Sequence, residues 1–263
     1  MLFRVCCGVG AACALLGCGN PANEACSEST ALARQAIKRA NGSALAPLGS
    51  WQTQVLRIDL SGERDGQQVE VTCSAGRIGP GAALTAKHCV HDLAPLSGHA
   101  LRSAESGGGC EPALPGAELT GEAAFHPELD LAVLRFVDPD DSEPGLALAA
   151  APAIVGDRVV LAGYGLTETN TSGELRAVEG RVLSIGEPNV GYTVVQGEGG
   201  GACVGDSGGP LLRALPGEIA TIYGILGRGS ASCLGRDEYA RVDLAREWLD
   251  AAVSGITWLP AEQ

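Results

Sequence analysis

Aromatic residues and positive charge are both scarce in this sequence. Phe, Trp and Tyr together make up 4% of its 263 residues, whereas glycine occurs 38 times. Such a composition favours short strands joined by many turns over long helices. The formal net charge of −13 leaves no basic patch for nucleic acid. We therefore expect a strand-rich protein that does not bind nucleic acid.

Long hydrophobic runs are missing as well. The apolar run from Val5 to Leu16 follows Arg4 and is too short to span a bilayer, so residues 1–17 are predicted to be a signal peptide. It ends in LLGC, which resembles the lipobox of bacterial lipoproteins and implies a lipid on Cys18. The alternative is an ordinary signal peptide that happens to contain cysteines. We expect an exported protein, either a lipoprotein of the bacterial cell envelope (outer-membrane or periplasmic) or secreted, whose only membrane contact is this lipid.

Cysteine usage agrees with export. Removal of residues 1–17 discards three of the ten cysteines, and lipidation of Cys18 leaves an even number that can pair in an oxidising compartment. These six are Cys26, Cys73, Cys89, Cys110, Cys203 and Cys233.

Residues 203–210 (CVGDSGGP) place Ser207 among glycines, which allow a tight turn with an exposed hydroxyl. The backbone N–H groups of Gly205 and Ser207 could converge there as an oxyanion hole. The alternative is a glycine-rich turn that happens to contain serine. A serine nucleophile also requires a base, and an acid to orient that base.

No histidine follows Ser207. The four histidines, His88, His91, His99 and His126, all precede it. This order excludes an α/β-hydrolase, in which the histidine follows the serine. The subtilisin order would need an acid such as Asp59 or Asp65 before the histidine, but the regular βα alternation of that fold is absent.

Three motifs in the order His, Asp, Ser resemble those of the trypsin-like serine proteases. They are LTAKHC around His88, with Lys87 where alanine is more usual, HPELDLAVL around Asp130, and the octapeptide around Ser207. The resemblance covers residues 50–253. It implies that Ser207 attacks the substrate, His88 transfers the proton and Asp130 orients the imidazole. The other histidines are expected to be surface or loop residues, and no second ligand pair accompanies His88, Cys89 and His91 to suggest zinc.

The implied fold is all-β, with two six-stranded antiparallel barrels and a short C-terminal helix. The barrels are expected at 50–140 and 146–253, joined by a polar linker at 138–145, after a tether or pro-like segment at 18–49 and before a tail at 254–263. Apolar spacing predicts a helix over 242–253, packed against the second barrel, and a helix-like patch over 29–40. Strands are predicted at 55–60, 69–78, 131–137, 159–162, 178–185, 192–195 and 221–226.

The resemblance also implies two disulfides, Cys73–Cys89 beside His88 and Cys203–Cys233 beside Ser207. Cys26 and Cys110 remain, and they could pair with each other or stay free.

Activation is where the chain departs from the family. Trypsin-like zymogens are cut before an Ile-Val-Gly-Gly type terminus, whose new ammonium pairs with the acid before the nucleophile, here Asp206. A cut after Arg39 would expose Ala40, which buries less apolar surface than isoleucine, a loss of roughly 2 kcal/mol.

Four residues are expected to line the primary specificity pocket: Gly201 and Ala202 at its base and Gly229 and Asp237 on its walls. A carboxylate from Asp237 favours cleavage after Arg or Lys, because a bound cation is the simplest partner for a desolvated acid. Medium aliphatic residues are the second expectation, and a solvated loop acid without a role is the remaining alternative.

The sequence thus predicts a monomeric serine endopeptidase that acts on proteins or peptides and needs neither cofactor nor metal. The alternative is an inactive or weakly active binding protein of the same fold. That alternative is favoured by the poor activation terminus and by Gly227, which stands where the family usually has a serine bonded to the acid of the triad.

Overall fold

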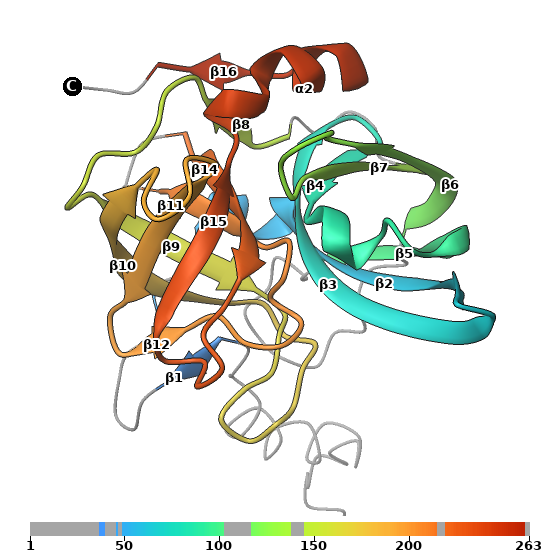
Figure 1. Ribbon diagram of the computed structural model, residues 1–263, viewed down its shortest axis with the longest axis horizontal. Coiled ribbons are helices and arrows are strands. Elements are labelled where there is room, and N and C mark those ends of the chain that lie inside the picture. The colour runs from blue at the N-terminus through green and yellow to red at the C-terminus, as the bar shows by residue number, and fades with distance from the viewer. Residues whose placement is uncertain are drawn as a thin grey trace, which may run out of the picture.

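The computed structural model describes residues 37–39, 46, 49–102, 117–137, 145–214 and 219–260. Two β-barrels lie side by side, with the helix α2 (Arg246–Ala252) at one end of the molecule (Figure 1). Cys18, Cys26, Cys110 and most of the predicted linker lie outside the described residues. Within the described part of the chain, the helices are too short to cross a membrane.

The first barrel is a closed ring of six antiparallel strands in the order β2-β3-β4-β7-β6-β5. A two-residue turn of Asp65 and Gly66, both with positive φ, joins its two longest strands in register. The strands are β2 (Val55–Arg64), β3 (Gln67–Gly79), β4 (Ala82–Thr85), β5 (Ala94–Arg102), β6 (Ala117–Phe125) and β7 (Ala132–Val137).

The second barrel follows the order β13-β9-β10-β11-β15-β14 and closes through the pairing of β13 with β14. The short strands β8 (Ala147–Ala149) and β16 (Trp258–Leu259) extend its sheet in parallel. The barrel strands are β9 (Arg158–Gly163), β10 (Arg176–Ile185), β11 (Tyr192–Gly197), β13 (Pro210–Arg213), β14 (Thr221–Arg228) and β15 (Arg236–Arg241).

The expected fold class is therefore confirmed, and all seven predicted strands are present. The strands β4, β5, β6, β13 and β15 were not predicted, because they are rich in alanine, glycine, proline or charged residues, which signal strands weakly. The prediction of a helix-like patch at 29–40 is wrong for the residues of that range that the structure describes. Its residues Lys38–Arg39 form strand β1, which pairs with β12 (Gly200–Gly201).

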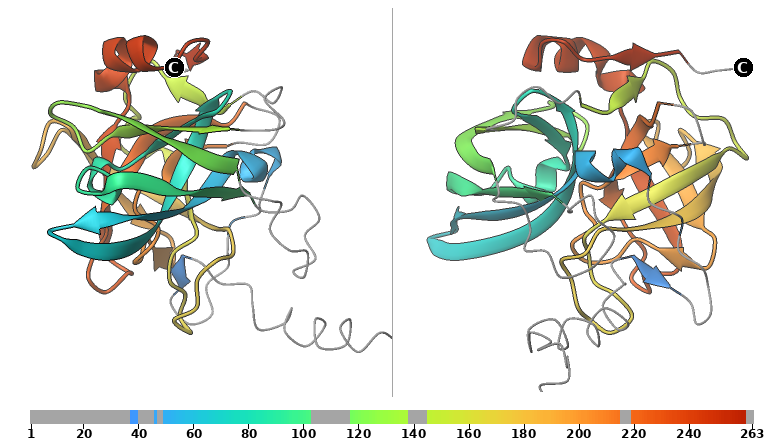
Figure 2. Two further views of the ribbon diagram at one scale, coloured as in Figure 1. Left: turned by 90° about the vertical axis from the view of Figure 1, so that its right-hand side faces the viewer. Right: turned by 180° about the vertical axis from the view of Figure 1, so that it is seen from behind.

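The position of the C-terminal helix differs from the expectation. Trp248 of α2 packs edge-on against His126, with ring centroids 5.2 Å apart, and Arg135 of β7 donates to the carbonyl of Ala252. Both partners belong to the first barrel, so α2 returns to the first barrel after the second is complete (Figure 2). The helix was predicted from its spacing, which reports an apolar face but not the surface that covers it.

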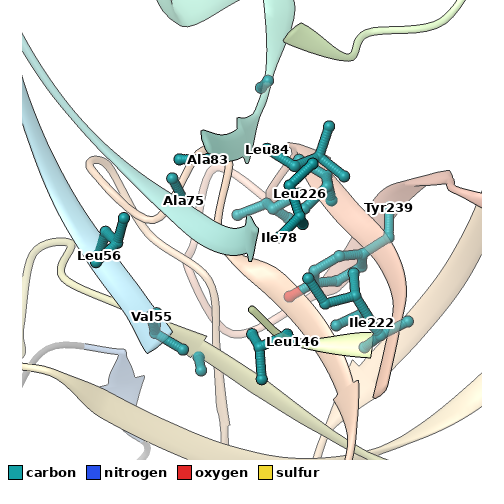
Figure 3. Close-up of a cluster of buried hydrophobic side chains, with 14 of the residues drawn as sticks. Val55, Leu56, Ala75, Ile78, Ala83, Leu84, Leu146, Ile222, Leu226 and Tyr239 are labelled. Atoms are coloured by element: carbon teal, nitrogen blue, oxygen red, sulfur yellow. The ribbon is translucent and has the colours of Figure 1, made fainter. Parts of the chain in front are cut away.

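Apolar side chains from both barrels meet between them. Val55, Ile78 and Leu84 from the first barrel lie in one buried cluster with Ile222 and Leu226 from the second (Figure 3). Each fully buried side chain of this size contributes about 1.5–3 kcal/mol. This apolar interface fixes the two barrels relative to each other, and the candidate site lies along this junction.

Candidate active site

His88 and Asp130 come from neighbouring strands of the first barrel. His88 lies in the 3-10 turn η2 (Lys87–Cys89) just after β4, and Asp130 lies just before β7. Because Thr85 pairs with Ala132, these two ends of the strands are adjacent. The backbone N–H of His88 donates to Oδ1 of Asp130 at 2.9 Å, and its Nδ1 lies 2.7 Å from Oδ2.

These contacts determine the charge of the carboxyl group. Burial alone would raise the pKa of Asp130, but the two hydrogen bonds from His88 and the positive charges of His88 and Lys87 bring it below its ordinary value. The carboxylate therefore stays ionised at neutral pH. It selects the imidazole tautomer that carries the proton on Nδ1, which leaves Nε2 as the acceptor.

The turn that carries Asp130 is organised by a second histidine. His126 is nearly buried, and its Nδ1 accepts the backbone N–H groups of Glu128 at 3.2 Å and Leu129 at 2.9 Å. Burial lowers the pKa of His126. Lys87 donates from Nζ to the carbonyl of His126 at 2.9 Å. His126 is thus a loop residue, as expected, but one that also organises the site. Its place at the start of the HPELDLAVL motif was its signal in the sequence.

Ser207 is half-buried on a loop whose conformation requires glycine. Gly205 and Gly208 have φ values of 95° and 82°, and a Cβ on Gly208 would lie 2.1 Å from Oγ1 of Thr85. Among the described residues, the N–H groups of Gly205 and Ser207 donate to no acceptor, whereas those of Asp206, Gly208 and Gly209 all do. Two unused donors two residues apart are available to an oxyanion.

Ser74 of β3 connects the first barrel to this loop, a role that was not predicted from the sequence. It is fully buried, and its N–H donates to the carbonyl of Ser207 at 2.8 Å. Its Oγ donates to the carbonyl of Gly205 at 3.0 Å and accepts the N–H of Tyr164 at 2.9 Å. A lone serine within a strand gives no sign of such a role, because its partners are distant in sequence.

The contacts of Cys89 show that His88 and Ser207 lie close together. Its Sγ lies 4.0 Å from Nε2 of His88 and 3.9 Å from the carbonyl oxygen of Ser207. No hydrogen bond joins Nε2 to the Ser207 hydroxyl in the described part of the chain. Such bonds are often long without substrate and shorten in the substrate complex.

Two disulfides surround the site. Cys73–Cys89 ties η2 to β3, and Cys203–Cys233 ties the Ser207 loop to the segment before β15. These are the two pairings that the resemblance implied.

Asp206, the residue before Ser207, is fully buried. Its Oδ2 accepts the N–H of Cys203 at 2.8 Å and its Oδ1 that of Gly165 at 2.7 Å. Burial raises its pKa to about 7, against the effect of these two bonds. The acid expected to receive an activation terminus is thus bonded to the backbone of its own chain.

The four expected pocket residues lie together. Asp237 is fully buried, with Oδ2 accepting from Ala202 at 3.0 Å and Oδ1 from Ser230 at 3.3 Å. A Cβ on Gly201 would be 3.2 Å from Oδ2, and one on Gly229 3.5 Å from Oδ1. Both glycines therefore flank the carboxylate, and burial raises its pKa to about 6.

The space near Gly227, where the family has a serine, holds an aromatic ring instead. A Cβ there would be 3.1 Å from Oδ2 of Asp130 and 3.0 Å from the ring of Tyr192. The guanidinium of Arg228 lies 5.5 Å over the same ring. Asp130 keeps both bonds from His88 without a serine at position 227.

Metal ligation has no support in the described residues, where no three His, Cys, Asp or Glu side chains are grouped to hold an ion. His91 is exposed and pairs with its neighbour Asp92 at 2.9 Å.

Two barrels with an Asp–His pair on one and a glycine-rich serine loop on the other define the class of trypsin-like serine proteases. The family model described as Trypsin matches residues 40–249, and the chain belongs to this family. Among solved structures it is similar to neuropsin, a serine protease expressed in the limbic system of mouse brain. The TM-score is 0.57 with 18% identity, over 79% of this chain and 97% of that one, so this likeness concerns the fold. The search of curated proteins finds no match.

Proposed function

We propose that this chain is a serine endopeptidase that hydrolyses peptide bonds through an acyl-enzyme on Ser207. The observation that carries the proposal is the His88–Asp130 pair, joined by two hydrogen bonds and facing a serine loop with two unused N–H groups.

The proposed reaction uses these groups in two steps. The Ser207 oxygen attacks the carbonyl carbon of the scissile bond while Nε2 of His88 takes its proton, and the N–H groups of Gly205 and Ser207 stabilise the oxyanion. The C–N bond then breaks, and the amine leaves with the proton from His88. Water attacks the acyl-enzyme in the same way, which releases the acid and restores the serine hydroxyl.

A fluorophosphonate probe tests the proposal without a known substrate, because it labels only an activated serine. We expect the wild-type protein to be labelled and to cleave peptides, and Ser207→Ala to lose both properties while keeping its melting temperature. His88→Ala should lose activity to a similar degree, since the triad acts as a unit. Peptidase activity of Ser207→Ala within tenfold of wild type would refute the assignment, and a wild-type protein that neither reacts nor cleaves would be a binding protein of this fold.

The proposed substrate preference is for Arg or Lys before the cleaved bond. Its support is the buried carboxylate of Asp237 between two glycines, with no Lys or Arg partner among the described residues. A cationic side chain between Gly201 and Gly229 would compensate that charge. We propose a monomeric enzyme that acts on proteins or peptides without a cofactor.

We further propose that the enzyme is exported and anchored through a lipid on Cys18. Globomycin, which blocks lipoprotein signal cleavage, should cause the precursor to accumulate, and Cys18→Ala should release the protein from membranes, because the acyl chains supply most of the membrane affinity. A soluble wild-type protein whose mature N-terminus lies beyond Cys18 and carries no lipid would contradict this.

A further inference from the structure

The segment before the expected activation cut is part of the folded domain. Lys38 and Arg39 form β1 and pair with β12, directly before Ala202 and the serine loop. Ile37 is 1% exposed, so its side chain is packed inside the protein. A cut after Arg39 would therefore sever a strand from the residue that follows it, rather than release a loose tail.

The side chain of Arg176 starts on the face of the sheet that lies against Asp206, the buried acid of the serine loop. Arg176 pairs directly with Gly163 across the β9–β10 ladder, and a Cβ on Gly163 would lie 2.3 Å from Oδ1 of Asp206. Side chains of paired residues start about 5 Å apart on one face of a sheet. Arg176 therefore begins one strand away from the carboxylate.

The guanidinium of Arg176 is buried, with its side chain 1% exposed. Its Nη1 donates to the carbonyl of Ile37 at 3.4 Å and lies 3.2 Å from Oε2 of Glu168. Its charge acts on Asp206 through space and lowers the pKa of that carboxyl, against the effect of burial. Arg176 thus links the uncut N-terminal segment to the acid that precedes the nucleophile.

Ser74 supports the same loop from the first barrel. Its hydroxyl donates to the carbonyl of Gly205, whose N–H is one of the two unused donors, and its own N–H holds the carbonyl of Ser207. The loop, which continues directly into β13 of the second barrel, is therefore also bonded to the first barrel. These bonds are present in the uncut chain, in which residues 37–39 are part of the fold.

We propose that the uncleaved chain is active, with Arg176 supplying the buried positive charge, and Ser74 the side-chain hydrogen bond, that hold the Asp206–Ser207 loop in its catalytic arrangement. The inference rests on the proposed function, since it concerns when Ser207 is reactive. Arg176 and Ser74 are positioning residues, because neither touches the reacting atoms.

The first test compares the intact chain with a chain cut after Arg39. Immobilised trypsin makes the cut, mass spectrometry checks both forms, and the fluorophosphonate labelling rate of Ser207 is measured for each. We expect the cut to raise the rate less than tenfold, and a larger rise would overturn the proposal while leaving the protease assignment intact. If neither form reacts, the proposed function itself fails.

The second test concerns the charge of Arg176 in the intact chain. We expect Arg176→Gln to slow labelling at least tenfold and Arg176→Lys, which keeps the charge, to stay within threefold of wild type. Arg181→Gln is the matched control, because Arg181 lies on the same strand but is exposed and bonded to Glu198. It should change the rate less than twofold.

A merely structural role for Arg176 would give another result. Arg176→Lys would then be as slow as Arg176→Gln, or both would be as fast as wild type, and either outcome would overturn the role of the charge. If Arg176→Gln does not fold, as judged by circular dichroism, the lysine variant and the intact wild-type chain still decide between the outcomes. Ser74→Ala should also slow labelling at least tenfold, and Ser74→Thr, which keeps the hydroxyl, should restore most of the rate.

Discussion

Three carboxyl groups near Ser207 differ in burial and in charge: Asp130 is partly buried, whereas Asp206 and Asp237 are fully buried. Asp130 has its pKa lowered because His88 donates two hydrogen bonds to it and adds a positive charge. Asp206 and Asp237 are bonded mainly to backbone N–H groups, which do not compensate for burial, so their pKa values rise to about 7 and about 6. Asp130 is therefore ionised at neutral pH, whereas Asp206 and Asp237 change charge near neutral pH.

The first prediction follows from the titration of Asp237. Only its ionised form attracts a cation, so the ratio of kcat/KM for an Arg peptide to that for a Leu peptide should rise as the pH increases through about 6. The ratio removes any pH dependence that the two peptides share. Asp237→Asn should lower the ratio at least tenfold at pH 8, the equivalent of about 1.4 kcal/mol, and make it independent of pH. A wild-type ratio that stays constant from pH 5 to 8 would contradict the proposed pocket.

At the scale of elements, the turn from His126 to Asp130 joins three parts of the structure. Lys87 of η2 bonds to it from one side, and Trp248 of α2 packs against it from another. The C-terminal helix is therefore connected to the turn that carries Asp130 through one buried histidine.

The second prediction concerns that histidine. His126→Ala should cost about 1–3 kcal/mol of stability, because two backbone N–H groups lose their acceptor. It should also lower kcat through movement of Asp130. His126→Asn, whose side chain can still accept a hydrogen bond, should recover part of both losses, and His99→Ala on an exposed position should change neither.

The lowered pKa of His126 also predicts that stability depends on pH. Because the folded pKa of His126 lies below 6.5, the folded state favours the neutral ring, and this stability is present above 6.5 and is lost as the pH falls through the folded pKa. Relative to His126→Asn, the wild-type protein should lose melting temperature between pH 7 and pH 5. A constant difference between the two proteins would refute this role.

At the scale of the whole molecule, the loop that carries Ser207 lies at the junction of the barrels and contains a fully buried carboxyl group. The serine loop is held there by the buried acid Asp206, whose folded pKa of about 7 is above its unfolded value. The folded state therefore binds the proton more tightly, and ionisation of Asp206 costs stability as the pH rises from about 4 to 7.

The third prediction measures this cost. Relative to wild type, Asp206→Asn should gain stability as the pH is raised from 4 to 7, by a few kcal/mol in all, since one unit of pKa shift corresponds to about 1.4 kcal/mol. Asp65→Asn, in the exposed hairpin turn, is the matched control and should show no such trend. Denaturant unfolding at a series of pH values checks this, and parallel curves for Asp206→Asn and wild type would exclude it.

The sequence by itself determined the family, the fold class and the candidate triad. Each motif is contiguous and carries its own chemistry, such as glycines on both sides of Ser207, and the order His, Asp, Ser excludes other folds. Strands with β-branched residues were also predictable, because their pattern is local.

The tertiary structure alone decided what holds the site. Ser74 and Gly205 are 131 residues apart, yet one hydrogen bond joins them, and Arg176 lies one strand away from Asp206 only because β10 pairs with β9. The surface under α2 and the docking of β1 onto β12 were decided in the same way. Such contacts depend on which elements the packed barrels bring together, and no local pattern of residues encodes that.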